Sequence, residues 1–283
     1  MTKPKIPTLH EAMMTHYKRY KNGQNSADQY IRLLKQCIKI LGNKRITQYT
    51  CKDVTKLIDY GKTVEKNSND TINMRTGYFK STLKTMSEEG FAVDLSFPRN
   101  PSKTKRVIPH LNDDEINQLW NKCRDLGFIE HLDIFQVLLD LGCRSGELLG
   151  VRKKDINFSY NQILFEKRKC NNPVAVPMTD RCMNIISLYA EWKEENDLIF
   201  PYDWYWLDKA WTKVRFDLNR ATDRTYTIHI LRHTAIKRMI MKAIPIPIVS
   251  KWVGHKSIQQ TMAYAHFAPY DLHKYVEVMN KCK

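Results

Sequence analysis

Four short motifs in the second half of the chain contain side chains that could act together on a phosphodiester. Arg144 and Arg232 carry permanently charged guanidinium groups, whose planar forks suit the nonbridging oxygens of one phosphate. His229 precedes Arg232 by three residues, so both side chains can point from one helix face at the same ligand. Lys169 can donate a proton, and the hydroxyl of Tyr264 can act as a nucleophile. Together these residues predict phosphoryl transfer through a covalent tyrosine intermediate.

Each motif also has an ordinary structural explanation when it is taken alone. Arg144 and Glu147 can form an ion pair one helical turn apart, and a tyrosine such as Tyr264 often only packs. In the combined interpretation, Glu147 holds Arg144 in place, and the Arg, His and Lys side chains neutralise the charge of the transition state. The sequence has no GxxxxGKS or GxxxxGKT loop, no HExxH motif and no acidic cluster typical of a two-metal site. We therefore expect a reaction that uses neither a metal nor another cofactor.

The composition indicates a polyanionic partner. The 283 residues include 46 Lys and Arg against 30 Asp and Glu, which gives a formal net charge of +16. An excess of this size is typical of nucleic-acid binding and sometimes of binding to an anionic membrane. No stretch approaches the ~20 apolar residues of a membrane span, and the first residues lack the apolar core of a secretory signal. The seven cysteines form no CxxC pair, which favours reduced thiols in a cytoplasmic protein with no membrane partner.

A proline-containing basic stretch at 98–110 predicts a linker between a helical DNA-binding domain (1–97) and a catalytic domain (111–283). Residues up to His110 hold 21 Lys and Arg against 9 Asp and Glu, whereas the rest hold 25 against 21. Most of the excess charge therefore belongs to the smaller, first part. Apolar periodicity predicts helices there at about 9–20, 27–42, 51–60 and 70–89.

The second part is predicted to be helical with one small antiparallel sheet. Strands at 163–166 and 174–177 flank a polar turn around 170–172. Helices are expected at about 112–125, 131–141, 179–192, 206–220, 230–242, 246–252 and 257–264. The predicted fold class is therefore mainly α with a small antiparallel β-sheet.

The order and spacing of the motifs resemble those of the tyrosine recombinases, also called the phage integrase family. LGCRSGELLGV resembles the family's first Arg box, HILRHTAIKRMI its second, and WVGHKSIQQTMAYAH its third. His255 stands nine residues before Tyr264, a spacing that selects this residue among the 14 tyrosines. The resemblance covers about residues 108–270, and the basic helical region before it is similar to the family's core-binding domain.

The resemblance implies a two-domain DNA clamp that recombines DNA without metal or ATP. Tyr264 would form a 3′-phosphotyrosyl link, with Lys169 as general acid to the leaving 5′-oxygen; the adjacent hairpin residue Lys167 is the alternative. The implied catalytic residues are Arg144, Lys169, His229, Arg232, His255 and Tyr264. The implied partners are double-stranded DNA, further protomers in a homo-tetramer on two duplexes, and accessory DNA-bending or directionality proteins. The implied location is the cytoplasm, that of a bacterial host if the gene belongs to a phage or mobile element.

Two segments are expected to support this assembly. Lys103, Lys105 and Arg106 in the linker would lie near DNA phosphates. The tail after Tyr264 has apolar residues at helical spacing and is expected to dock on a neighbouring protomer, or else on its own domain. The family's larger members carry an arm-site-binding domain, for which there is no room before Thr8.

Three other functions remain open at this point. A type IB-like topoisomerase shares the Tyr, Arg and His set, but relaxes DNA as a monomer and joins no second duplex. A non-catalytic DNA-binding regulator could keep the same fold, and an RNA-binding protein could carry the motifs by chance. A covalent adduct that requires Tyr264, followed by strand transfer to a second duplex, would separate these functions.

Overall fold

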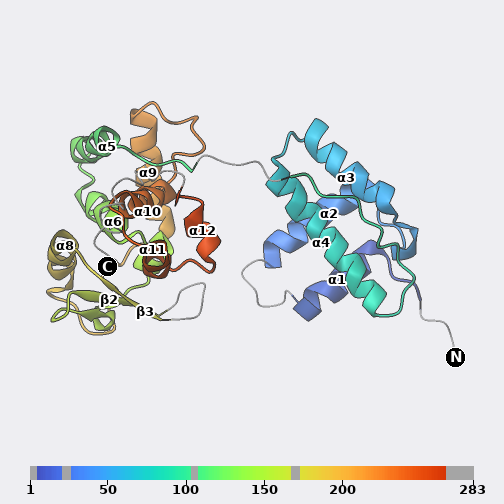
Figure 1. Cartoon of the computed structure of the whole chain (residues 1–283), viewed down its shortest axis with the longest axis horizontal. Coiled ribbons are helices and arrows are strands. Elements are labelled where there is room, and N and C mark those ends of the chain that lie inside the picture. Colours follow the sequence, from blue (N-terminus) through green and yellow to red (C-terminus); the bar gives the residue numbers. More distant parts are fainter. Residues whose placement is uncertain (1–4, 21–26, 103–107, 167–172, 266–283) are drawn as a thin grey trace, which may run out of the picture. The chain divides into compact units, whose positions relative to one another are not determined.

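The chain divides into two units. The computed structural model describes residues 5–20, 27–102, 108–166 and 173–265. The first unit ends at Arg106 and the second begins at Val107. Both are helical for the most part, and the small sheet belongs to the second (Figure 1). The predicted fold class, mainly α with a small antiparallel sheet, is confirmed.

Helices near the predicted positions build the first unit. They are α1 (Leu9–Tyr20), α2 (Ala27–Leu41), α3 (Cys51–Thr63) and α4 (Asn69–Glu88), with a 3₁₀ turn at Ile46–Gln48. Leu34, Cys37 and Leu41 recur at helical spacing on α2, and all are buried. The long helix α4 packs against each of the other three and adds Phe79 and Leu83 to their common core. This unit therefore forms a helical bundle around α4.

An arginine is buried inside this bundle. The side chain of Arg75 on α4 is only 1% exposed. Its Nη1 lies 2.6 Å from Oε2 of Glu65, and its Nη2 donates to the carbonyl oxygen of Leu57 at 3.1 Å. Gly61 makes room for the guanidinium, because a Cβ there would lie 2.7 Å from Nη2 of Arg75. The arginine thus joins α3, the following turn and α4.

The first residues of the expected linker lie along α4. Asn73 donates from Nδ2 to the carbonyl oxygen of Pro101 at 2.8 Å, and Asn69 donates to that of Ser102 at 2.8 Å. Lys80 donates to the carbonyl oxygen of Pro98 at 3.0 Å. Residues 98–102 are therefore attached to the first unit, whereas Lys103, Lys105 and Arg106 lie outside the described residues.

The second unit carries the remaining helices. They are α5 (Asp113–Asp125), α6 (Ile129–Leu141), α7 (Ser145–Leu148), α8 (Asp180–Ala190), α9 (Trp204–Asp217), α10 (His229–Met241), α11 (Ile246–Val253) and α12 (Ile258–Met262). Asn112 and Glu115 cap each other's backbone N–H groups at 3.0 and 2.8 Å, which fixes the start of α5. The apolar helix α6 is central and packs against α5, α8 and α10. None of the helices in the described ranges is long and apolar enough to cross a membrane.

The sheet has one strand more than the sequence pattern predicts. Strands β1 (Ile156–Asn157), β2 (Gln162–Phe165) and β3 (Val174–Pro177) form an antiparallel sheet in that order. Ile163 pairs with Val176, and both side chains face the core. Strand β1 has only two residues, which is too short to show an alternating pattern.

Candidate active site

The end of α6 approaches the start of α10 closely. Gly142 ends α6 with a left-handed φ of 62°, and a Cβ there would lie 3.1 Å from Cβ of Ala235 on α10. The carbonyl oxygen of Gly142 accepts a hydrogen bond from Nη1 of Arg232 at 2.8 Å. Trp252 on α11 donates to the carbonyl oxygen of Leu141 at 3.1 Å, which brings α11 to the same place. The glycine in the first motif thus allows three helices to meet.

Arg232 is a buried cation with unused hydrogen-bonding capacity. Its side chain is 3% exposed, and its Nη2 has no hydrogen-bond partner among the described residues. Burial, and next the positive charge of Arg144, lower the pKa of Arg232 to about 10. A guanidinium that is desolvated and lies beside another cation is stabilised when an anion binds next to it.

Arg144 stands directly before α7, where Glu147 fixes its position. Oε1 of Glu147 accepts from Nη1 of Arg144 at 2.6 Å, and Oε2 accepts from the backbone N–H of Arg144 at 3.1 Å. Glu147 is nearly buried, whereas the Arg144 side chain keeps 25% of its surface exposed. The carboxylate therefore holds the arginine by two points and leaves part of its guanidinium accessible.

Tyr264 follows α12 and packs against α10 and α11. The predicted helix 257–264 ends earlier, at Met262, so this tyrosine lies in the turn that follows. Its side chain is 4% exposed and contacts an apolar cluster that includes Ile236, Val249 and Val253. Burial raises the pKa of Tyr264 to about 12, although the positive charge of Arg232 opposes this effect. The phenol is therefore protonated and lies near Arg232 of its own chain.

His255 and His229 lie in the same electrostatic environment. His255 follows Gly254, and its Nδ1 shares a hydrogen bond of 2.7 Å with Oγ1 of Thr261. Burial, and next the charges of Arg232 and Arg144, lower the pKa of His255 to about 4, so its ring is neutral at neutral pH. His229 is the first residue of α10, is exposed, and contributes to the same effect on His255.

Most of the predicted site residues thus come together in the second unit. Arg144, His229, Arg232, His255 and Tyr264 are joined by direct or electrostatic contacts. Lys169 and its alternative Lys167 lie outside the described residues, as does the tail from residue 266 onward. Within the described ranges, no group of three or more His, Cys, Asp or Glu side chains is arranged to hold a metal ion.

His233 is a further site residue, outside the set that the sequence motifs predict. It lies on α10 directly after Arg232, and its Nδ1 forms a hydrogen bond with the hydroxyl of Tyr264. Its ring also meets that of His229 edge to face, with centroids 4.7 Å apart. The sequence contains a pattern that indicates this position, because His229 and His233 are four residues apart and therefore share one helix face.

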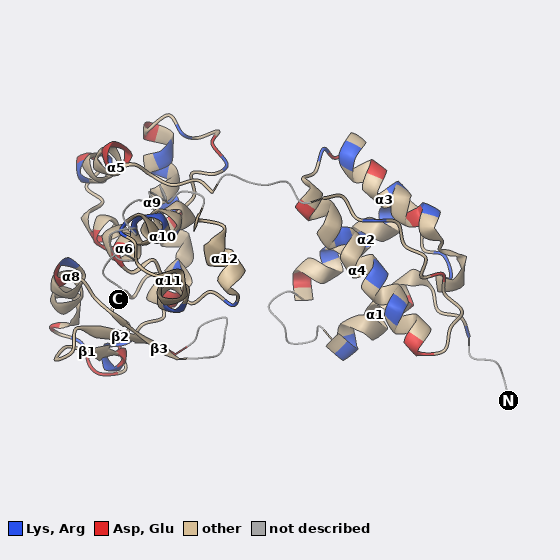
Figure 2. Ribbon diagram, in the orientation of Figure 1, with Lys and Arg blue, Asp and Glu red and all other residues tan. Residues whose placement is uncertain are grey.

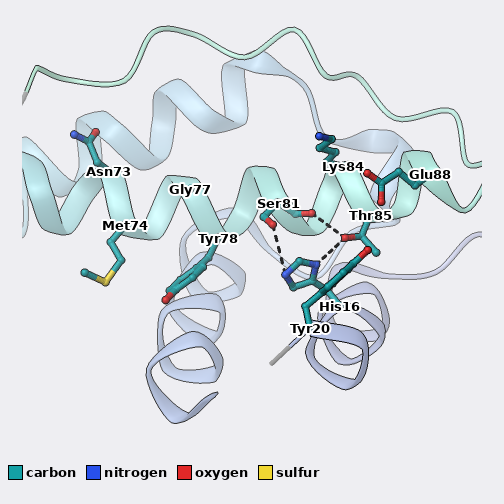
Figure 3. A pocket seen from close by; sticks show the side chains of 10 residues that line it. All are labelled: His16, Tyr20, Asn73, Met74, Gly77, Tyr78, Ser81, Lys84, Thr85 and Glu88. Carbon is teal, nitrogen blue, oxygen red and sulfur yellow. Dashed lines mark hydrogen bonds between the residues drawn. The ribbon is translucent and has the colours of Figure 1, made fainter. Parts of the chain in front are cut away.

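A second candidate surface lies on the first unit. A hollow of about 690 Å³ opens between α1 and α4 and is lined by Asn73, Met74, Ser81 and Lys84 among others. His16 on α1 is among the lining residues, with Nδ1 bonded to Oγ1 of Thr85 at 2.7 Å (Figure 3). Lys and Arg residues are distributed over the helices of this unit (Figure 2).

Comparison with known proteins identifies the class. Residues 109–270, more than half of the chain, match the model of the phage integrase family. The chain therefore belongs to this family of tyrosine recombinases. The predicted resemblance is thereby confirmed.

Individual relatives agree with this assignment. Tyrosine recombinase XerA of Saccharolobus solfataricus is 29% identical over 188 residues, which cover 65% of this chain and 61% of that protein. The structure of the Tn1549 transposon integrase in complex with transposon right end DNA has a TM-score of 0.82 at 16% identity, covering 98% of this chain and 100% of that one. The structure of a lambda integrase tetramer bound to a Holliday junction has a TM-score of 0.69 at 16% identity, covering 88% of this chain and 78% of that one. At these identities the structures establish the common fold.

Proposed function

We propose that this chain is a site-specific DNA recombinase that cleaves and rejoins strands through a 3′-phosphotyrosyl intermediate, without metal or ATP. The observation that carries the proposal is the buried guanidinium of Arg232, with its Nη2 unpaired among the described residues. Arg144 and Tyr264 are its electrostatic neighbours. A scissile phosphate placed there would supply the missing anion and lie beside a nucleophile.

In the proposed reaction, the hydroxyl oxygen of Tyr264 attacks the phosphorus and passes its proton to a histidine of the site as the new bond forms. The bond from phosphorus to the 5′-oxygen breaks, and this oxygen takes a proton from Lys169. A 5′-hydroxyl from the same or another strand then attacks the phosphotyrosine and reverses the step. Because each phosphodiester is exchanged for another ester, the reaction needs no external energy source.

The remaining residues stabilise the negative charge that grows on the phosphate oxygens. Arg144 and Arg232 contribute guanidinium donors, and His255 contributes a ring N–H. Because the hydroxyl of Thr261 can donate to Nδ1 of His255, the proton of the neutral ring can lie on Nε2 and face the phosphate. His229, at the exposed start of α10, is a phosphate donor or proton acceptor in this scheme.

A nicked suicide duplex tests the chemistry. A binding duplex is first selected from a random-sequence library and then prepared with nicks at successive phosphates. We expect a covalent protein–DNA band at one nick position, and its loss in Tyr264→Phe. Transfer of the bound strand to a second duplex distinguishes a recombinase from a topoisomerase. A mobility shift without a covalent band would support a non-catalytic regulator and contradict the proposal.

The proposed DNA-binding surface of the first unit is the hollow between α1 and α4. Asn73, Ser81 and Lys84 are polar side chains that line it beside Met74. We propose that this hollow contacts duplex DNA.

For the whole reaction, we propose that four protomers assemble on two duplexes. Accessory proteins would direct this reaction, which would take place in the cytoplasm.

Two single charge reversals, one inside the hollow and one on another helix of the first unit, test this surface. Lys84→Glu should weaken duplex binding about 10-fold and lower the slope of log K against log salt by about 1 or more. Lys56→Glu, at an exposed position on α3, is the matched control and should change binding less. Equal effects of the two substitutions would contradict the proposed surface.

A further inference from the structure

The hydroxyl of Tyr264 is already hydrogen-bonded in the free protein. Its partner is Nδ1 of His233, and the two rings lie with centroids 5.8 Å apart. Tyr264 is 4% exposed and lies against the apolar residues of α10 and α11, so bulk water has little access to this hydroxyl. A group that contacts the reacting oxygen in a nearly dry site is well placed to exchange a proton with it.

The charges around His233 favour its role as an acceptor. Burial, and next the charge of Arg232, lower the pKa of His233 to about 4, so the ring is neutral at neutral pH. A neutral imidazole has one nitrogen that accepts a hydrogen bond. Because the phenol of Tyr264 keeps its proton at neutral pH, it can donate to Nδ1 of His233.

We propose that His233 takes the proton of Tyr264 during strand cleavage and returns it during rejoining. The inference rests on the proposed function. As the bond from the Tyr264 oxygen to phosphorus forms, the phenol proton moves to Nδ1 of His233 and the ring becomes an imidazolium. The bond to the 5′-oxygen breaks, and that oxygen takes a proton from Lys169. In the reverse step the 5′-hydroxyl attacks and gives its proton back to Lys169, while the imidazolium protonates the departing phenolate.

Binding of DNA makes this transfer more favourable. Without DNA, the positive charge of Arg232 opposes a second positive charge on His233. A phosphate bound to Arg232 offsets that charge and raises the basicity of the adjacent ring. The base thus becomes effective when the substrate arrives. The neighbouring ring of His229, whose centroid lies 4.7 Å from that of His233, faces the same phosphate charge.

The test compares His233→Ala and His233→Asn with the wild-type chain in single-turnover formation of the covalent adduct. Asparagine offers an acceptor near the position of Nδ1 but takes up no proton. We expect both variants to be slower by about 10²–10⁴-fold at pH 7, the range typical of a lost general base. Their rates should rise with pH as the phenol ionises, whereas the wild-type rate should change little. Recovery of the rate by His233→Asn, with a wild-type pH profile, would show a positioning role and overturn the proposal.

A sulfur substitution separates the two proton transfers. A duplex with a bridging 5′-phosphorothiolate has a leaving group that needs no proton. This substrate should restore the rate of Lys169→Ala but not that of His233→Ala. Equal restoration of both variants would place His233 on the leaving-group side and overturn the assignment.

A ligation reaction checks that the site is intact. In a Tyr264→Phe background, a strand ending in a 3′-p-nitrophenyl phosphate can be joined to a 5′-hydroxyl with no need to protonate the leaving phenolate. We expect the same ligation rate with and without His233→Ala. A large loss in the double variant would mean that His233 supports the phosphate pocket, contrary to the proposal. Absence of an adduct from the wild-type chain on every duplex would instead overturn the proposed function itself, and this inference with it.

Discussion

Two buried arginines, Arg75 in the first unit and Arg232 in the second, differ in how their charge is balanced. Both donate to a backbone carbonyl, at 3.1 and 2.8 Å respectively. Arg75 also has a carboxylate at 2.6 Å, that of Glu65. Glu147, whose negative charge also acts on Arg232, is hydrogen-bonded to Arg144 instead. A desolvated guanidinium with its own anion joins parts of the fold, whereas one without an anion is prepared for a ligand.

The distribution of charged residues along the sequence fits the same proposed division of roles. The residues up to His110 hold 21 basic against 9 acidic side chains, yet the proposed catalytic residues all lie beyond residue 140. Under the proposed function, general attraction to a polyanion would come mainly from the first part of the chain and the chemistry on one phosphate from the second. The two arginines allow this difference to be tested directly.

Removing the unbalanced charge should have the largest effect. We expect Arg232→Gln to slow adduct formation by about 10²–10³-fold, as when one transition-state donor is lost. The folded state should be retained or slightly stabilised, because an unneutralised buried charge is removed. Single-turnover kinetics and thermal unfolding measure the two quantities. A strongly lowered Tm would instead assign Arg232 a structural role similar to that of Arg75.

Removing the balanced charge should affect stability and not chemistry. Arg75→Met should lower the free energy of unfolding by about 3 kcal/mol, because Glu65 is left in a partly buried position without its partner. Urea unfolding measures this loss, and adduct formation at low temperature should stay close to that of the wild-type chain. The double variant Arg75→Met/Glu65→Gln should recover part of the stability. Equal stability of the two variants would contradict a balanced pair.

The burial of His233 and His255, and next their proximity to Arg232, predict that the free protein is less stable in acid. The pKa values of His233 and His255 fall from 6.5 to about 4 on folding, so the unfolded chain binds more protons between these values. The free energy of unfolding should therefore decrease as the pH falls through this window. We expect a total loss of about 2 kcal/mol from pH 6.5 to 5, a value reduced to allow for solvent screening of these partly exposed rings. Urea unfolding across this range should give a flatter profile for the variant His233→Asn/His255→Asn. Identical profiles would contradict the pKa shifts.

The smallest effect concerns the space reserved for Arg75. Gly61→Ala places a Cβ 2.7 Å from Nη2 of Arg75 and 2.8 Å from Cγ1 of Ile72, so we expect a net loss of about 1 kcal/mol after the gain in helix propensity. Gly77→Ala on α4 is the control, because nothing lies within 4 Å of its Cβ position. That variant should gain about 0.5–1 kcal/mol. Urea unfolding of both variants should show changes of opposite sign.

Local patterns in the sequence were sufficient for most of the helices and for the family. Helix faces and caps depend on residues three or four positions apart, as with Asn112 and Glu115 at the start of α5. The two-residue strand β1 was missed because it is too short for any pattern. The sequence pattern did not predict the burial of Arg75 either, because the space for its guanidinium depends on Gly61, which lies on the neighbouring helix α3.

For the site, the sequence by itself determined which side chains are available and in what order: two Arg boxes, a histidine nine residues before a tyrosine, and a strong excess of positive charge. Only the tertiary structure decided that Arg232 has no carboxylate bound to it among the described residues, that Tyr264 lies beside the arginine of its own chain, and that His233 contacts the phenol. These contacts join residues 90 positions apart, as for Arg232 and Gly142, or 31 apart, as for His233 and Tyr264. The physical reason is that residues so far apart in the sequence meet only when the helices of the second unit pack around α6. The local spacing of apolar residues does not specify that packing.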